Sequence, residues 1–123
     1  MILPDPKTVG PISRTDIVRY QGASGDFNPV HHDEEFARTA GLPAPLGVGM
    51  LHAGMMTAWA TDHFGPERVR LVGVRWKKPV WPGDTLVISG EVVDENHEQF
   101  TIAIRAVNQD DVLVAEGWTT FVT

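Results

Sequence analysis

The residues best suited to chemistry in this sequence are an acid, an amide and an imidazole that lie close together. Asp26, Asn28 and His31 belong to the string Ser-Gly-Asp-Phe-Asn-Pro-Val-His. Pro29 has a fixed φ and no N–H, so a bend there can bring the three side chains to one side of a cavity. A carboxylate and an imidazole that share a water can remove one of its protons and return another. The amide both donates and accepts, so it can orient these partners.

The same residues also fit an ordinary loop. Asp, Asn and Pro are common turn residues, and the string could be an Asx-type turn that leads into a helix N-cap. His31 would then be a polar surface residue. Residue types alone leave both interpretations open.

Composition limits the classes of protein and partner. The 123 residues, 42% of them hydrophobic, predict one domain over residues 1–123. The net charge is −6, with 16 acidic against 10 basic residues, and no basic run stands out. Nucleic acid is therefore not an expected partner. The chain has no cysteine, which excludes disulfides, thiolate catalysis and zinc–thiolate sites.

No metal or other cofactor is expected. The remaining candidate ligands are His31, His32 and Asp33 with the distant His52, and adjacent histidines on a loop usually point apart. The N-terminal residues lack the long apolar region of a signal peptide, and no segment is apolar enough to span a bilayer. A cytoplasmic protein with no membrane partner is the expectation.

The elements that must position the loop begin with a helix before it. The S-x-x-D pattern from Ser13 to Asp16 is typical of a helix N-terminus. The helix should turn Ile17 and Val18 inward and end near Gly22–Gly25, where glycines allow the chain to leave it.

Two further helices are predicted after the loop. Asp33 can cap a short helix that stops at Gly41. The longest helical segment runs from about Val48 to Phe64 and is apolar over most of its circumference, so it should be enclosed on several sides. His52 within it is interpreted as a packed or hydrogen-bonded side chain.

The rest of the chain has the period-two pattern of strands. Alternation covers residues 71–76, 85–92, 100–105 and 112–122, with turn signals between the runs. A short edge strand is expected near residues 8–12. Short connections predict an antiparallel meander, and the fold class is therefore α+β, with a curved antiparallel sheet around a long central helix.

Three motifs together resemble one family. Ser24–His31, with Asp33 and Phe36-Ala37 after it, is similar to the signature of the MaoC-like (R)-specific enoyl-CoA hydratases of the hot-dog superfamily. Gly49-Met50-Leu51 resembles the Gly-Met-Leu that starts the family's central helix, and residues 78–84 resemble its Pro-Val-x-x-Gly-Asp turn. The resemblance covers most of the chain from about residue 13 and implies the hot-dog fold.

The resemblance also implies a site. Asp26 and His31 would hold and activate the catalytic water, with Asn28 between them. The backbone N–H of Gly49, at a helix N-terminus, would bind the oxygen that becomes negative during reaction. Many members carry His before this Gly-Met-Leu, where Val48 stands here; the departure concerns the surroundings of the site rather than the pair.

The implied reaction is the (R)-specific hydration of trans-2-enoyl-CoA to (R)-3-hydroxyacyl-CoA, or the reverse dehydration, without a cofactor. An acyl-CoA thioester would be the substrate, and a homodimer or heterodimer of hot-dog subunits the assembly. Arg75, Lys77 and Lys78 form the densest basic cluster and are candidates for the phosphates of coenzyme A. A charged strand edge that discourages aggregation explains them equally well.

Two alternatives stay open. In a hot-dog acyl-CoA thioesterase, an acidic residue on the central helix usually drives hydrolysis, but Val48–Phe64 contains no Glu, and Asp62 lies near its far end. The chain could also be a hydratase-like subunit of a heteromeric complex. The presence of Asp26, Asn28 and His31 argues against a subunit without catalytic residues.

Overall fold

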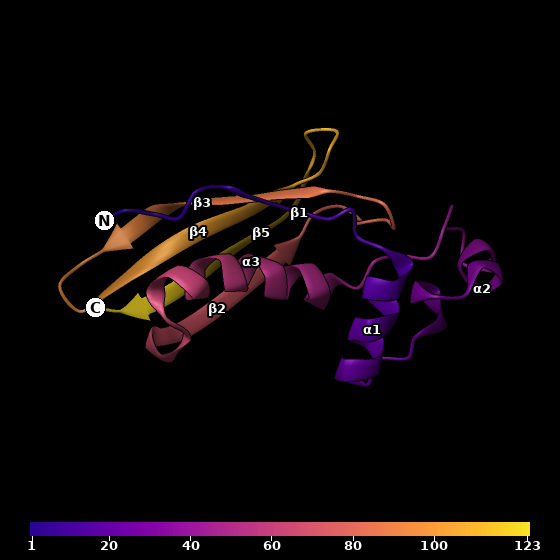
Figure 1. Ribbon diagram of the computed structural model, residues 1–123, viewed down its shortest axis with the longest axis horizontal. Coiled ribbons are helices and arrows are strands. Elements are labelled where there is room, and N and C mark those ends of the chain that lie inside the picture. The colour runs from indigo at the N-terminus through magenta and orange to yellow at the C-terminus, as the bar shows by residue number, and fades with distance from the viewer.

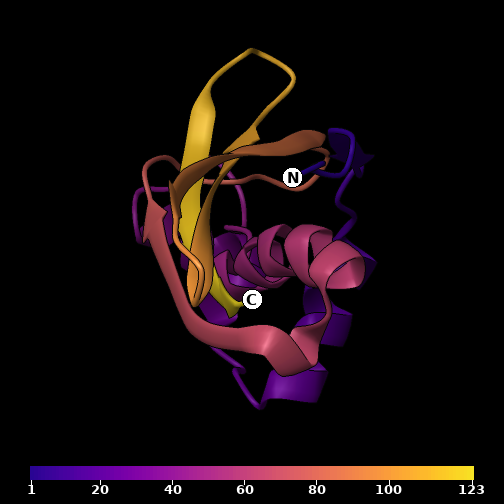
Figure 2. The same ribbon diagram turned by 90° about the vertical axis from the view of Figure 1, so that its left-hand side faces the viewer.

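A five-stranded antiparallel sheet curves around one long helix in the computed structural model, which describes residues 1–123. The helix is α3 (Gly49–Phe64). The strands are β1 (Lys7–Val9), β2 (Val69–Trp76), β3 (Leu86–Glu95), β4 (Gln99–Val107) and β5 (Leu113–Val122). Figures 1 and 2 show α3 lying along the concave face of the sheet. The predicted α+β class, with a sheet wrapped around a central helix, is confirmed.

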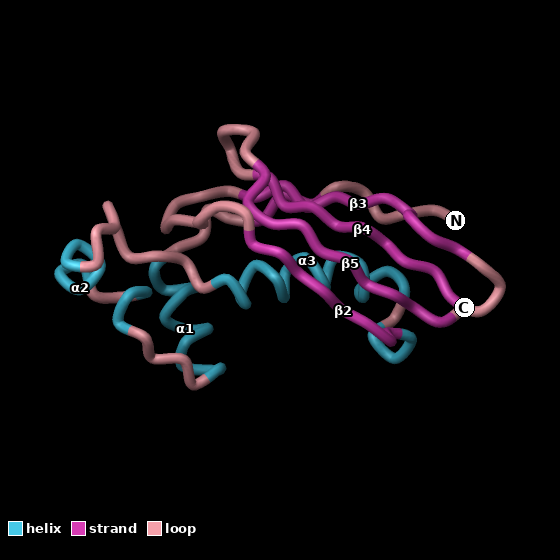
Figure 3. The backbone as a smooth tube through the Cα atoms, turned by 180° about the vertical axis from the view of Figure 1, so that it is seen from behind, coloured by secondary structure: helices cyan, strands magenta, loops and turns pink.

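The strand order differs from the predicted meander. The order is β1-β3-β4-β5-β2, so β3, β4 and β5 form a meander while β2 pairs with β5 at one edge. The segment after β2 explains this, because its two ends are bound at different places. The N–H of Lys77 donates to Val114 at 2.8 Å, and the N–H of Gly83 donates to Ile12 at 2.7 Å. The chain therefore crosses one end of the sheet before β3 begins (Figure 3).

The core lies between α3 and the inner face of the sheet. Met56 and Trp59 of α3 are buried there with alternate residues of β4 and with several residues of β5, some of them consecutive. The rings of Phe100 and Phe121 stack with their centroids 5.2 Å apart. Burying each such side chain contributes about 1.5–3 kcal/mol. The period-two pattern thus correctly predicted the buried residues of β4, whereas β5 is buried on both faces in part of its length.

One flank of α3 is open, contrary to the prediction that it is enclosed on several sides. Met50 is 55% exposed and Val72 of β2 is 48% exposed. β2 is an edge strand and covers this flank only in part.

No helix of this chain combines the length and apolar content that a membrane span requires.

The remaining helices form a lobe beyond one end of α3 (Figure 1). They are α1 (Arg14–Ser24), the 3-10 turn η1 (Pro29–His31) and α2 (Glu34–Thr39), while a second 3-10 turn, η2 (Pro66–Arg68), follows α3. α1 has the predicted capping box: the Ser13 hydroxyl accepts from the Asp16 N–H at 3.0 Å, and the Asp16 carboxylate accepts from the Ser13 N–H at 2.9 Å. These bonds lower the pKa of Asp16.

Only one side of α1 meets the core. Ile17 is fully buried as predicted, but Val18 is 51% exposed, so that part of the prediction is wrong. Consecutive residues on a helix point about 100° apart, and the lobe packs on a single narrow stripe of α1. The helix ends before Gly25, whose φ of 75° is the left-handed conformation that glycine allows.

Candidate active site

The turn at the end of α1 sets the position of Asp26. Its Oδ1 accepts a hydrogen bond from the N–H of Asn28 at 3.2 Å. The side-chain oxygen of Asn28 in turn accepts from the N–H of Val30 at 3.0 Å and caps η1. Asn28 therefore shapes the loop through its own backbone neighbours. The contacts in this structure do not include a bond from its side chain to that of Asp26 or His31, the bridging contact that the sequence suggested.

His31 faces Asp26 from the other side of the turn. Its Nδ1 lies 2.8 Å from the carbonyl oxygen of Leu46. A carbonyl only accepts, so Nδ1 carries the proton, and Nε2 of the neutral ring has a free lone pair. That Nε2 lies 3.9 Å from Oδ2 of Asp26. The separation is too long for a direct hydrogen bond, and it allows one water to contact both atoms.

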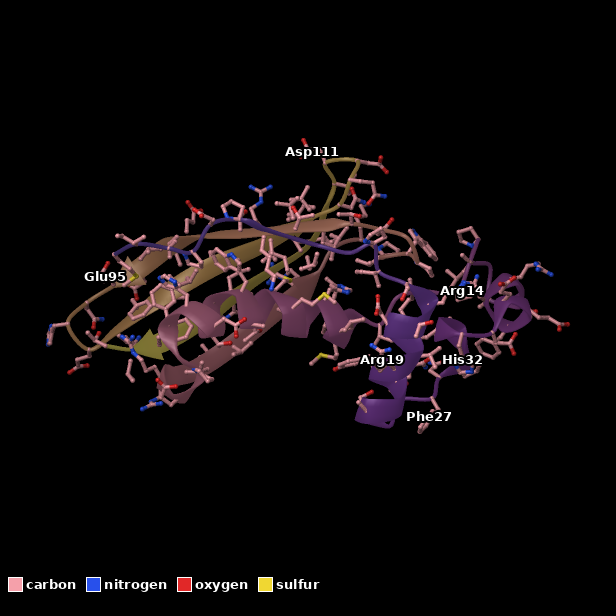
Figure 4. All side chains as sticks on the ribbon, viewed as in Figure 1. Arg14, Arg19, Phe27, His32, Glu95 and Asp111 are labelled. Atoms are coloured by element: carbon pink, nitrogen blue, oxygen red, sulfur yellow. The ribbon has the colours of Figure 1, made fainter.

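The two side chains differ in exposure. Asp26 is 47% exposed and His31 only 11% exposed. Phe27, between Asp26 and Asn28, is 68% exposed and points away from the lobe, as Figure 4 shows. The candidate pair thus lies at the surface of a single chain, with its imidazole partly sheltered.

Gln21 is a member of this site that the sequence interpretation missed. It is 2% exposed, and its Nε2 donates to the carbonyl oxygens of Asp26 at 2.9 Å and Asn28 at 3.1 Å. Its Oε1 lies 3.1 Å from Nδ1 of His32. Its position four residues after Ile17 on the buried stripe of α1 was the available signal, because i and i+4 share a helix face.

Gly49 is the first residue of α3. Its N–H has no carbonyl one turn earlier in the helix, and it lies at the positive end of the helix dipole. A Cβ here would come within 2.7 Å of Nε1 of Trp76. Packing against Trp76 therefore explains why this residue is glycine. The N–H is the feature that makes Gly49 a candidate for binding an oxyanion.

A cleft of about 260 Å³ opens beside Gly49. It is lined by Leu46, Gly47, Gly49, His52, Trp76, Lys77, Lys78, Pro79 and Val80. Asp26 and His31 do not line it, but two backbone contacts join it to their loop. The Leu46 carbonyl binds His31, and the Leu46 N–H donates to Val30 at 2.9 Å. Leu46 therefore lies between the cleft and His31: it lines the cleft, and its carbonyl binds the imidazole.

The predicted basic cluster divides between two surfaces. Lys77 and Lys78 line the cleft, whereas Arg75 lines a separate hollow on the outer face of the sheet. Glu116 lies 3.2 Å from Nζ of Lys77 and 3.9 Å from Nη1 of Arg75. The three cations accordingly do not form one phosphate-binding group in this structure.

His52 is packed, in agreement with the sequence interpretation. It is 3% exposed, and its Nε2 has no hydrogen-bond partner in the protein. Burial lowers its pKa to about 4, and a backbone hydrogen bond at Val48 partly opposes that shift. The imidazole is neutral near pH 7.

The sequence of this chain is similar to those of known proteins. Residues 4–115 match the family described as MaoC like domain. Over 108 residues the chain is 31% identical to the 3-oxo-4,17-pregnadiene-20-carboxyl-CoA hydratase beta subunit of Mycobacterium tuberculosis, and the match covers 87% of this chain and 82% of that protein. Four other curated relatives are longer, and the chain spans between 7% and 40% of their length.

Solved structures are similar over the whole chain. The ChsH1-ChsH2 complex from Mycobacterium tuberculosis contains a chain with a TM-score of 0.86 and 25% identity, and the match covers 98% of this chain and 94% of that one. The R-hydratase PhaJ1 from Pseudomonas aeruginosa has a TM-score of 0.85 and 26% identity, with 100% and 82% covered. These neighbours have the hot-dog fold, so the predicted hot-dog architecture is confirmed.

Proposed function

The chain belongs to the MaoC-like domain family, and from that membership and the site geometry we propose that it hydrates trans-2-enoyl-CoA to (R)-3-hydroxyacyl-CoA, or catalyses the reverse dehydration. The supporting observation is the approach of Asp26 Oδ2 and His31 Nε2 to 3.9 Å, with both lone pairs free for one water. The R configuration is proposed by analogy with the similar R-hydratase structure.

The proposed chemistry needs only this chain's residues and water. A water held between Asp26 and His31 loses a proton to the pair as its oxygen bonds C3 of the enoyl thioester. The electrons of the C2–C3 double bond move toward the thioester carbonyl, and the N–H of Gly49 stabilises the resulting negative oxygen. The pair then returns the proton to C2, and water has been added across the double bond. Asn28 holds the turn that keeps Asp26 in place.

The proposed substrate is a coenzyme A thioester. Lys77 and Lys78 lie on the cleft beside Gly49 and could attract its phosphates. The chain as a whole carries a net charge of −6, which disfavours an acidic acyl carrier protein. The similar Mycobacterium tuberculosis hydratase subunit has a CoA thioester in its name, which supports the same choice.

A second candidate is a subunit of a heteromeric hydratase. One similar protein is named a beta subunit and one similar structure is a two-protein complex. The 47% exposure of Asp26 leaves room for a partner subunit to cover the pair. Thioester hydrolysis has less support, because the only carboxylate on α3 is the exposed Asp62, near the opposite end from Gly49.

The direct test is an assay with crotonyl-CoA. We expect the enoyl absorbance to fall without release of free thiol, and chiral analysis to identify (R)-3-hydroxybutyryl-CoA. Thiol release would support the thioesterase instead. If the purified chain is inactive alone but active after addition of a second hot-dog subunit, the heteromeric assignment is correct.

A further inference from the structure

The side-chain amide of Gln21 is buried and contacts the backbone of the loop that carries Asp26. We propose that Gln21 is a positioning residue that holds Asp26 at the correct distance from His31. This inference rests on the proposed function, because it assigns a task within the same site. Gln21 itself contacts neither the water nor the thioester in the proposed reaction.

The orientation of the Gln21 amide is fixed by its partners. Both hydrogens of Nε2 are used, one on the Asp26 carbonyl and one on the Asn28 carbonyl. Oε1 accepts from Nδ1 of His32. Rotating the amide by 180° would place Oε1 against two carbonyl oxygens that cannot donate. At 2% exposure, water cannot replace these bonds, so only one orientation satisfies every group.

The two carbonyls bound by Gln21 flank Phe27 and so fix the backbone at the point where Asp26 leaves α1. The other contact between α1 and Asp26 is weaker, with the N–H of Asp26 3.4 Å from the hydroxyl of Ser24. Asp26 is also exposed on its outer side. Gln21 is therefore the main restraint on the backbone of Asp26.

His31 is held independently. Its ring is bound to the Leu46 carbonyl, which belongs to the segment before α3. The distance between Oδ2 of Asp26 and Nε2 of His31 thus depends on two separate anchors, one at Gln21 and one at Leu46. A displacement of about 1 Å in such a pair can reduce turnover about 100-fold.

Gln21→Met tests the proposal, since methionine has a similar length and no hydrogen-bonding amide. We expect kcat for crotonyl-CoA hydration to fall between about 10-fold and 100-fold with little change in KM. The matched control is His32→Ala, which removes the imidazole that donates to Oε1 but leaves both bonds from Nε2 to the loop, so kcat should stay within about 3-fold of the wild type. Gln21→Glu keeps the shape of the side chain and removes its N–H donors. If the methionine variant does not fold, the same loss of kcat is measured in the glutamate variant.

A double-mutant cycle separates positioning from general damage. If Gln21 acts through Asp26, Gln21→Met should change the residual rate less than about 2-fold when Asp26→Asn is already present. An equal loss in both backgrounds, or wild-type kcat in Gln21→Met and Gln21→Glu, overturns the proposal.

Amide hydrogen exchange gives a readout that does not depend on activity. Loss of the Gln21 anchor should speed exchange at Asn28, Val30 and His31, whose N–H groups are bound within the loop. If the wild type is inactive on crotonyl-CoA both alone and with a second hot-dog subunit, the proposed function fails, while faster exchange in Gln21→Met still supports the anchor. Unchanged exchange in these residues contradicts the positioning role whatever the activity.

Discussion

At the residue scale, the imidazole of His31 owes its tautomer to the carbonyl of Leu46. The bond at Nδ1 leaves Nε2 unprotonated and directed at Asp26, which is the state a base requires. The residues next to His31 in the sequence do not specify this tautomer, because Leu46 is fifteen positions away.

Removing either member of the pair should abolish most turnover. We expect Asp26→Asn and His31→Ala to retain the fold and to lower kcat by about 10²–10⁴, the usual contribution of general acid–base catalysis. Asparagine retains an oxygen that can accept the Asn28 N–H, so the turn should survive. Crotonyl-CoA kinetics and circular dichroism measure both effects.

Asp62→Asn is the matched control, since Asp62 is an exposed carboxylate on α3 away from the site. Its kcat should equal that of the wild type. Near-normal kcat in Asp26→Asn or His31→Ala would contradict the proposed role of that residue in activating the water.

The buried His52 should make the fold sensitive to acid. Its pKa is lowered from the ordinary value of 6.5 to about 4 in the folded chain, because burial disfavours the charged imidazole. Below pH 6.5 the unfolded chain binds this proton more readily than the folded chain, so the free energy of unfolding falls as the pH drops from 6.5 toward 4. The total loss is about 3 kcal/mol.

Urea unfolding at several pH values measures this loss. His52→Gln cannot take up the proton, so its free energy of unfolding should change less across the same pH interval. Identical pH slopes in the wild type and His52→Gln would show that another group is responsible.

At the element scale, α1 links folding to the site, because it carries Gln21 and ends at the turn before Asp26. Its start is set by the capping box between Ser13 and Asp16. Its end is set by Gly25 in the left-handed conformation. The capping box and Gly25 both depend on residues close in the sequence, which explains why the bounds of α1 could be predicted.

Ser13→Ala should destabilise the chain by about 1 kcal/mol, since it removes the side-chain oxygen that accepts from Asp16. For a domain of this size we expect the Tm to fall by about 4 °C. Thermal unfolding followed by circular dichroism measures it. Thr15→Ala, at an exposed position in the first turn, is the control and should leave Tm nearly unchanged; equal Tm values for the two variants would contradict the capping role.

At the scale of the whole molecule, the open flank of α3 is the surface on which we expect a second subunit. A groove of about 450 Å³ runs between α3 and β2. Its floor includes the small residues Ala53, Gly54 and Ala58, which allow close approach of another element. β2 is also an edge strand whose outer side has no strand partner in this chain.

Val72→Lys should weaken the expected dimer, because it places a charge in the apolar groove. Size-exclusion chromatography with light scattering should show a dimer for the wild type and a monomer for this variant. Val93→Lys, at an exposed valine of β3, is the control and should remain dimeric. A monomeric wild type would contradict the expected homodimer and favour a partner of different sequence.

The sequence by itself determined the local features of this protein. The capping residues, the turn glycines, the period-two strands and the apolar central helix each depend on neighbours within a few positions, so their pattern predicted the elements closely. The signature around Asp26 and His31 likewise indicated the family. These features depend on the spacing of residues that are close in the chain, and the sequence shows that spacing directly.

Only the tertiary structure decided how distant parts meet. The pairing of β2 with β5, the Leu46 carbonyl on His31 and the packing of Trp76 against Gly49 join residues far apart in the chain. The burial of Gln21 under the loop depends on how α1 docks. Such contacts arise from competition among all the elements for one core, and no short window of sequence contains that competition.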